Sequence, residues 1–389
     1  MKKKILYLME YPIDLPGGAQ MSTRTLCEGL SHEMYEIVVA CPNLLHPEVK
    51  EDSFRIVPYQ SDENREKNKL KRITNFFSRI GSFYRIIKEE QPDLIHVQMS
   101  ESLITYGMLR IFGIFKKIPF VYTDRSLYFG YRIHSMTCIK ATLKHAAAMI
   151  CTTQTNKDLW VKNSNISNIH VIPNTISSSF DEYDHEKRCE MRKKAGLTEN
   201  DFVIGFAGRI SEEKDWPFVK ELVPMLQKSG ITMKIALVLS VYEAQDEAIA
   251  ADLKRAITAS VGEDNFIYLQ DLSQQEIADY YYLVDVFMMT SVFESFGKAA
   301  IEAMSRKCAV ISTRVGGLPE VIGKEEDLYT KETVDTCINR VKQFWSDREL
   351  LQEEKEFFYQ RFHDHYTQSS CLNNHEMLYA QILKGESAL

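Results

Sequence analysis

The feature that most constrains the fold is an alternation of short apolar runs with helix-length amphipathic segments. Runs such as Ile5–Met9 are separated by segments with helical spacing, such as Met21–His32 and Phe76–Glu90. This alternation is typical of βαβ units and of a parallel sheet covered on both faces. The expected strands of this first set are Ile5–Met9, Ile37–Ala40, Leu94–Val97, Phe120–Tyr122 and Ala148–Thr152.

The pattern then restarts after a segment rich in Pro, Asn and Ser, which predicts a break in regular structure near residue 178. A chain of 389 residues is also too long for one hydrophobic core. We therefore expect a domain over 1–178 and a second over 179–367. The second set of expected strands is Val203–Ala207, Lys234–Leu239, Phe266–Leu269, Val286–Met289 and Ala309–Thr313, with helices over Pro217–Lys228 and Ser273–Val284.

This organisation predicts an α/β fold of two Rossmann-like, doubly wound parallel-sheet domains that face a central cleft. Open α/β sheets bind ligands at the carboxyl ends of their strands, so the cleft is the expected site. Ser273 is followed by Glu276 three residues later, which is the signature of a capping box at a helix start.

Composition excludes several classes of protein. The net charge of −7 argues against a general nucleic-acid binder, because neutralising phosphates requires a basic face. The eight cysteines form no CxxC pair and no zinc-finger spacing, which indicates buried thiols of a reducing compartment. No apolar run reaches the length of a membrane helix, and the apolar start ends at Glu10, too early for a signal peptide. We expect a cytoplasmic protein.

Four loops carry candidate chemistry. In the first, Gly17 and Gly18 follow the first strand and open a helix, where backbone N–H groups can meet a phosphate. A plain tight turn explains the same residues. The loop is not a GxGxxG fingerprint, so a nicotinamide or flavin cofactor is not expected.

The second loop follows the first strand of the second domain and carries Arg209 and Lys214. Two cations there can neutralise a diphosphate that gains charge as its bond to a sugar breaks. The alternative is a solvated pair beside Glu212 and Glu213.

The third loop holds Glu294 and leads into a helix that contains Glu302. Both carboxylates can accept hydrogen bonds from sugar hydroxyls. Phe296, Gly297 and Lys298 would offer free backbone N–H groups at the helix start. A helix-start glutamate and a surface glutamate are the alternative. The fourth loop, Gly316-Gly317-Leu318-Pro319-Glu320, lies beside the third or forms a strand-ending turn.

Together, the two-domain pattern and the second, third and fourth loops resemble the family 4 glycosyltransferases of the GT-B fold. The resemblance covers nearly the whole chain and is stronger in the second domain. It implies a retaining enzyme that moves a sugar from a nucleotide donor, often a UDP-sugar. It also implies that the last helix, Gln368–Lys384, crosses back to the first domain.

The resemblance assigns roles to the candidate residues. Arg209 and Lys214 match the cations that hold the donor diphosphate, Glu302 matches the carboxylate at the ribose, and Glu294 matches the one near the transferred sugar. The remaining matches are the backbone of Phe296, Gly297 and Lys298 around sugar and phosphate, Gly17 and Gly18 as the first-domain loop, and Tyr268-Leu269-Gln270 at the base.

One departure concerns the end of the strand at Phe120–Tyr122, where many members carry a histidine. This chain has Asp124 and Arg125 there, and His96 ends a neighbouring strand. A direct catalytic role for Asp124 or Arg125 is therefore an expectation alongside a structural one.

The acceptor is expected to meet the first domain. Between Glu63 and Glu90, aromatic and aliphatic residues recur at helical spacing among eight Lys and Arg residues, and Leu109–Lys117 adds more. A helix of this kind can lie on an anionic membrane or attract an anionic acceptor, or it can simply pack on the sheet with solvated cations. The first case would put the chain at the inner face of the plasma membrane.

The sequence thus predicts a retaining, hexosyl- or N-acetylhexosaminyl-type glycosyltransferase. The acceptor would be a glycan, a glycolipid or lipid-linked glycan, or an anionic cell-surface polymer. There is no DxD motif, and the cations already present can replace a metal, so we expect no metal and no cofactor. The alternatives are a nucleotide-sugar epimerase and an inactive nucleotide-sugar-binding partner of a transferase.

Overall fold

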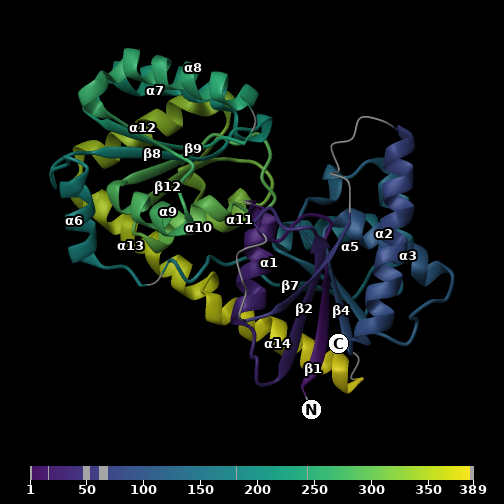
Figure 1. The fold of residues 1–389 in the computed structure, drawn as a ribbon. Coiled ribbons are helices and arrows are strands. Elements are labelled where there is room, and N and C mark those ends of the chain that lie inside the picture. The colour runs from purple at the N-terminus through teal and green to yellow at the C-terminus, as the bar shows by residue number, and fades with distance from the viewer. Residues whose placement is uncertain are drawn as a thin grey trace. The chain divides into compact units, whose positions relative to one another are not determined.

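The computed structural model of the chain describes residues 2–15, 17–46, 53–60, 69–180, 182–242 and 244–385. The chain divides into two compact units. Unit 1 comprises Met1–Thr175 and Gln368–Leu389, and unit 2 comprises Ile176–Thr367. The sequence placed the first division after residue 178, and the structure places it after Thr175. Each unit is an α/β sandwich of its own (Figure 1).

The described part of unit 1 contains a sheet of seven parallel strands in the order β3-β2-β1-β4-β5-β6-β7. The five strands expected from the sequence are confirmed, and β3 and β7 are additions at the two edges. The strands are β1 (Lys3–Leu8), β2 (Tyr35–Pro42), β3 (Arg55–Tyr59), β4 (Leu94–Gln98), β5 (Phe120–Asp124), β6 (Ala148–Cys151) and β7 (Ile169–Val171).

Helices cover both faces of this sheet because the central strands are buried on both sides. One face packs against side chains such as Phe83, Tyr106 and Trp160. The helices on that face are α2 (Lys69–Glu90), α3 (Ser100–Ile111), α4 (Ile133–Leu143) and α5 (Gln154–Asn163). The other face packs against α1 (Gly18–Gly29) and α14 (Gln368–Lys384).

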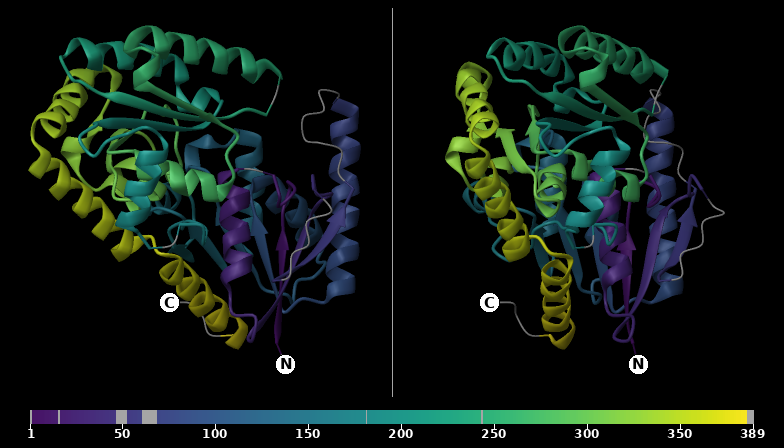
Figure 2. Two further views of the ribbon diagram at one scale, coloured as in Figure 1. Left: turned by 60° about the vertical axis from the view of Figure 1, so that its left-hand side comes forward. Right: turned by 90° about the vertical axis from the view of Figure 1, so that its left-hand side faces the viewer.

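The last helix, α14, is part of the core of unit 1. Tyr379 is fully buried, and its hydroxyl lies 2.7 Å from the hydroxyl of Tyr7 on β1. The amide of Ser31 donates to Glu376 at 2.7 Å. Figure 2 shows α14 (yellow) beside α1 (purple), where Leu372 packs over Gly29. The predicted return of the final helix to the first domain is what the structure shows.

The described part of unit 2 contains a sheet of six parallel strands in the order β10-β9-β8-β11-β12-β13. The five expected strands are again confirmed, and the two-residue β13 is an addition at one edge. The strands are β8 (Val203–Arg209), β9 (Lys234–Ser240), β10 (Phe266–Gln270), β11 (Val286–Met289), β12 (Ala309–Thr313) and β13 (Leu328–Tyr329).

Two apolar clusters fill the two faces of the second sheet. One packs under α7 (Trp216–Lys228), α8 (Ala244–Val261) and α12 (Val334–Ser346). The other packs under α6 (His185–Lys194), α9 (Gln274–Tyr280), α10 (Lys298–Ser305), α11 (Leu318–Ile322) and α13 (Arg348–His365). The predicted capping box is present, with Ser273 and Glu276 bonded reciprocally at the start of α9.

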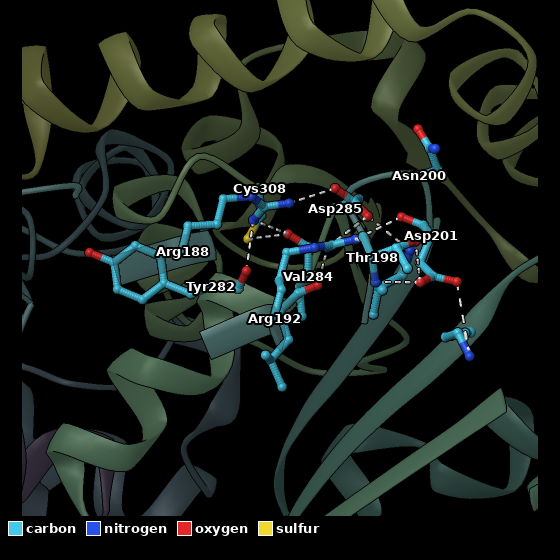
Figure 3. A network of polar contacts seen from close by, with 12 residues as sticks. Arg188, Arg192, Thr198, Asn200, Asp201, Tyr282, Val284, Asp285 and Cys308 are labelled. Carbon is cyan, nitrogen blue, oxygen red and sulfur yellow. Dashed lines mark hydrogen bonds and ion pairs between the residues drawn. The ribbon is translucent and has the colours of Figure 1, made fainter. Parts of the chain in front are cut away.

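A buried ionic cluster joins helices of unit 2 to the amino end of β11 (Figure 3). Asp285 is 4% exposed, and its carboxylate contacts Arg188 at 2.7 Å, Arg192 at 3.3 Å and Lys355 at 2.6 Å. It also accepts from the amide of Val203 at 2.9 Å. Burial alone would raise the pKa of Asp285, but the three cations hold it well below its usual range. The cluster fixes α6 and α13 on one face of the sheet.

Candidate functional site

The candidate residues of unit 2 gather at the carboxyl edge of its sheet. Strands β8, β11 and β12 are neighbours, so the loops that follow them lie side by side. The hydroxyl of Thr290 donates to the carbonyl of Lys214 at 2.7 Å, and Val292 N donates to the carbonyl of Glu213 at 2.9 Å. Thr313 donates to the carbonyl of Ser291 at 2.6 Å. These bonds join three loops into one surface.

Lys214 and Glu294 meet at this surface, although 80 residues separate them in the chain. The ammonium of Lys214 lies 2.7 Å from a carboxylate oxygen of Glu294. Both side chains are partly buried, at 19% and 18% exposure, so the pair remains accessible to a ligand. The Lys214 side chain crosses next to Gly208, which has no side chain to obstruct it. The structure therefore brings together a cation and a carboxylate that the sequence assigned to one site.

The start of α10 lies beside this pair. Gly297 caps the helix with φ of 103°, a conformation that favours glycine, and no side chain satisfies the first N–H groups. A Cβ at Gly297 would lie 2.5 Å from Leu318. Gly317 of the fourth loop donates its N–H to the carbonyl of Glu294 at 3.0 Å. This bond joins the fourth loop to the third loop beside the start of α10.

Phe296 contributes only its backbone to this edge. Its side chain is 2% exposed and packs in the core against Tyr366, with ring centroids 5.7 Å apart. The aromatic ring therefore anchors the loop and leaves the peptide groups beside it at the surface.

Glu302 lies within α10 and is 9% exposed. One carboxylate oxygen accepts from the hydroxyl of Tyr281 at 3.1 Å, and the other lies 3.8 Å from the ammonium of Lys298. Burial raises the pKa of Glu302, while Lys298 and Tyr281 act in the opposite direction. Tyr281 was not identified from the sequence, because the run of three tyrosines at 280–282 matches no site motif.

Arg209 is placed differently from Lys214. It ends β8, but its guanidinium is 52% exposed and pairs with Glu213 at 2.9 Å. This is the solvated arrangement that the sequence left open for the loop. The carbonyl of Arg209 accepts from the indole of Trp216 at 2.9 Å. This bond holds the backbone of Arg209, while its side chain extends toward solvent.

Leu269 lies on the edge strand β10, two strands from β8 in the sheet order. Its side chain is partly buried and packs against the apolar core.

In unit 1, Gly17 and Gly18 occupy the start of α1. Gly17 is the N-cap, no side chain caps the helix, and the first turn contains no acidic residue. A Cβ at Gly18 would meet nothing within 4 Å. The protein around Gly18 thus imposes no steric need for glycine. Pro16, the first residue of this motif, lies outside the described residues.

Asp124 is fully buried at the end of β5. One carboxylate oxygen accepts from the amide of Ser126 at 3.1 Å and from the hydroxyl of Tyr131. The other accepts from Asn156 at 2.9 Å and from the indole of Trp160 at 2.6 Å. These bonds occupy both oxygens, which favours a structural role for Asp124 over the catalytic one that the sequence suggested.

His96 is likewise buried. Its Nδ1 lies 2.6 Å from the hydroxyl of Tyr379 on α14, and its Nε2 lies 2.7 Å from the hydroxyl of Thr123. Burial, His375 and Arg125 lower the pKa of His96 well below its ordinary value, so the ring stays neutral. His96 therefore has a structural role in the core of unit 1.

Arg125 is the residue next to Asp124, and it points to different partners. Its guanidinium donates to the amide oxygen of Gln98 at 3.1 Å, to the hydroxyl of Thr23 at 3.5 Å, and to the amide oxygen of Asn174. Gln98 and Asn174 were not identified from the sequence, because single amides outside a motif carry no pattern.

Within the residues that the structure describes, no three His, Cys, Asp or Glu side chains gather as they would around a metal ion. No described helix combines the length and the apolar character needed to cross a bilayer.

Comparison with protein families gives two matches. Residues 16–180 match the family described as Glycosyltransferase Family 4, and residues 187–361 match the family described as Glycosyl transferases group 1. Among curated relatives, the phosphatidylinositol N-acetylglucosaminyltransferase GPI3 subunit of Saccharomyces cerevisiae (strain YJM789) is 26% identical over 267 residues. That match covers 66% of this chain and 56% of the yeast protein. The chain spans about half the length of the curated relatives it matches.

Comparison with solved structures shows the same architecture. Sucrose-phosphate synthase from Thermosynechococcus elongatus matches with a TM-score of 0.84 at 18% identity, covering 99% of this chain and 100% of that one. Anabaena HepE, solved in complex with UDP and glucose, matches with a TM-score of 0.76 at 15% identity, covering 97% and 99%. The two family matches together span most of the chain, and the fold agrees with both. The chain therefore belongs to the family 4 glycosyltransferases and has the GT-B fold.

Proposed function

We propose that this protein is a retaining glycosyltransferase that moves a sugar from a nucleotide-sugar donor, a UDP-sugar, to a glycan, glycolipid or cell-surface polymer. The observation that carries the proposal is the Lys214–Glu294 pair beside the uncapped start of α10 in unit 2. The family to which the chain belongs and the UDP in the HepE structure support the donor class.

The diphosphate is assigned to Lys214, to Arg209 and to the start of α10. A half-buried ammonium interacts with phosphate more strongly than an exposed one because water screens it less. When the glycosidic bond breaks, the leaving diphosphate gains negative charge, and fixed positive groups stabilise that charge in the transition state. Arg209 would leave Glu213 to join Lys214, which its exposed side chain permits.

The two glutamates are assigned to hydroxyl groups of the donor. Glu302 accepts from Tyr281 and lies near Lys298, yet retains lone pairs that a ribose diol can use. Glu294 lies beside Lys214, the proposed ligand of the diphosphate, and is therefore assigned to the sugar that the diphosphate carries. In this arrangement no side chain is assigned as a base. The acceptor oxygen attacks the anomeric carbon as the bond from that carbon to the diphosphate breaks, and an oxygen of the leaving diphosphate on the same face takes the hydroxyl proton. That route needs no metal ion.

Unit 1 carries the surface proposed for the acceptor. Large apolar side chains are exposed just after α3 and around the start of α4, including Phe112 at 74%, Phe129 at 72% and Ile133 at 84%. Arg132 precedes Ile133, and Lys117 lies in the loop that follows α3. Exposed aromatics with neighbouring cations suit an anionic membrane surface, and hence a lipid-linked acceptor. Residues 61–68 of the basic stretch identified in the sequence lie outside the described residues.

The direct test measures UDP binding and donor turnover in the full chain. Lys214→Gln removes the proposed phosphate contact, and Lys220→Gln is a matched control, because Lys220 pairs with Asp252 of α8 on the outer helical layer. UDP should raise the melting temperature of the wild type and of Lys220→Gln by mass action. Hydrolysis or transfer of the accepted UDP-sugar should fall by roughly 10²–10³-fold in Lys214→Gln, the scale of losing one charge-stabilising donor. Unchanged turnover in Lys214→Gln would refute the assignment.

A further inference from the structure

Arg125 is a guanidinium without a counter-ion. Among the described residues it forms no ion pair, and its hydrogen-bond partners are Gln98, Asn174 and Thr23, all neutral. A desolvated charge is costly unless a group of opposite charge compensates it. Arginine does not escape that cost by losing its proton in proteins.

The groups around Arg125 do not supply a negative charge either. The phenols of Tyr7 and Tyr379 are buried, and burial raises the pKa of both well above the usual value. Burial raises the pKa of Cys371 to about 12. The two nearby histidines are neutral for the same reason, since burial lowers the pKa of His96 and brings that of His375 to about 4. At neutral pH none of these five described groups is therefore a compensating anion.

The adjacent carboxylate is engaged elsewhere. Asp124 turns away from Arg125, and its oxygens accept from Ser126, Tyr131, Asn156 and Trp160. It fixes the loop in which Arg125 lies, but it leaves the guanidinium charge uncompensated.

A second polar group beside Arg125 also lacks a partner. Gln98 is fully buried, and its amide oxygen is taken by Arg125. Its amide nitrogen has no hydrogen-bond partner among the described residues. An orphaned donor beside an unpaired cation indicates that an acceptor with negative charge belongs there. Arg125 itself is partly exposed at the carboxyl edge of the sheet, so such a group can reach it.

We propose that Arg125 and Gln98 form an anion-binding subsite in unit 1 that takes a carboxylate or phosphate group of a substrate. The subsite combines the carboxyl ends of β4 and β5 with the segment after β7 and with α1, which contributes Thr23. The claim that the site binds an anion stands by itself. The claim that this anion is part of a substrate rests on the proposed glycosyl transfer. Two sources fit the chemistry: an acidic or phosphorylated acceptor, and a transferred sugar that carries a carboxylate.

The first test measures binding of inorganic phosphate to the full chain, in the presence of saturating UDP. The readout is the rise in melting temperature with phosphate relative to chloride at equal ionic strength. Arg125→Gln should weaken phosphate binding roughly tenfold to a hundredfold, the scale of losing hydrogen bonds to a charged group. Arg110→Gln is the matched control, because Arg110 donates to the carbonyls of Phe115 and Ile118 and should bind phosphate as the wild type does. Undiminished phosphate binding in Arg125→Gln overturns the proposal.

A second measurement needs no variant, in case Arg125→Gln does not fold. Butanedione modifies accessible arginines, and peptide mass spectrometry gives the rate at each position. Phosphate should slow the modification of Arg125 and leave that of Arg110 unchanged. Equal rates at Arg125 with and without phosphate contradict the subsite. If phosphate no longer slows the modification of Arg125 once UDP is added, the subsite belongs to the donor diphosphate, and the proposal is overturned as well.

The source of the anion is then separated by substrate. If Arg125→Gln raises KM for UDP-glucuronate but not for UDP-glucose, the carboxylate belongs to the transferred sugar. If it raises KM for an acidic acceptor but not for a neutral one, the anion belongs to the acceptor. Equal effects on charged and neutral substrates contradict a specificity role. Failure of UDP to bind at all would instead count against the proposed function, since the phosphate measurement at Arg125 stands without it.

Discussion

Replacing Asp285 with asparagine tests how much of the stability of unit 2 depends on its buried ionic cluster. The side chain is 4% exposed and faces three cations, and Lys355 lies 2.6 Å away. Removing one partner from a buried ion pair typically costs about 3–5 kcal/mol, because the remaining charge is left uncompensated. Three cations share this one carboxylate, so we expect the upper part of that range. For a unit of this size the loss corresponds to a fall of roughly 8–20 °C in melting temperature.

Calorimetry of the full chain measures this fall in the transition of unit 2. Asp252→Asn is the control, because Asp252 forms exposed pairs with Lys220 and Arg255 and should change little. The pKa of Asp285 is depressed in the folded state, so its contribution is present above the ordinary carboxyl pKa and is lost only as pH falls through the folded value. The difference between Asp285→Asn and the wild type should therefore be present in full at pH 6 and should not grow from pH 6 to about pH 9. A fall smaller than that of the control, or one that grows across that pH range, would refute this reasoning.

Three further predictions concern other sites. Burial, with Glu354 close by, raises the pKa of Asp327 to about 7, so its stabilising contribution is lost as pH rises through neutrality. Urea unfolding at pH 6 and pH 8.5 should therefore show Asp327→Asn gaining stability relative to the wild type at the higher pH; a constant difference contradicts this. Gly297→Ala forces a positive φ on a side chain that meets Leu318, and should lower stability by about 1–3 kcal/mol in the same assay. Gly18→Ala meets no neighbouring atom, so its melting temperature should equal or exceed that of the wild type while donor turnover falls; unchanged turnover would show that no ligand approaches Gly18.

The sheets were largely predictable because their central strands are buried on both faces and read as continuous apolar runs. The strands that the sequence did not reveal lie at sheet edges, where that signal is weak. β3 contains Pro58 and is only partly buried, and β7 and β13 have three and two residues. Proline at an edge strand is tolerated because one side of the strand needs no hydrogen bonds.

The candidate site was predictable to the level of loops but not of contacts. The sequence placed Lys214 and Glu294 at strand ends, yet their ion pair depends on β8 and β11 being neighbours, which crossover connections decide. For Arg209 the nearby Glu213 was visible in the sequence, and the structure shows that pair. The role of Asp124 was not predictable, because its four partners come from the loop after β5 and from α5, which only the fold brings together.

The return of α14 to unit 1 has a consequence for biosynthesis. Unit 2 is contiguous and is complete once Thr367 has left the ribosome, whereas unit 1 lacks one wall of its core until α14 emerges. Until then Tyr7 and His96 have no Tyr379 to bond, and the apolar groove under the missing helix stays open to water. The unit whose translation starts first is thus the last to finish folding. A stop codon just before Gln368 should therefore yield a truncated chain that needs chaperones, although most of its sequence is present.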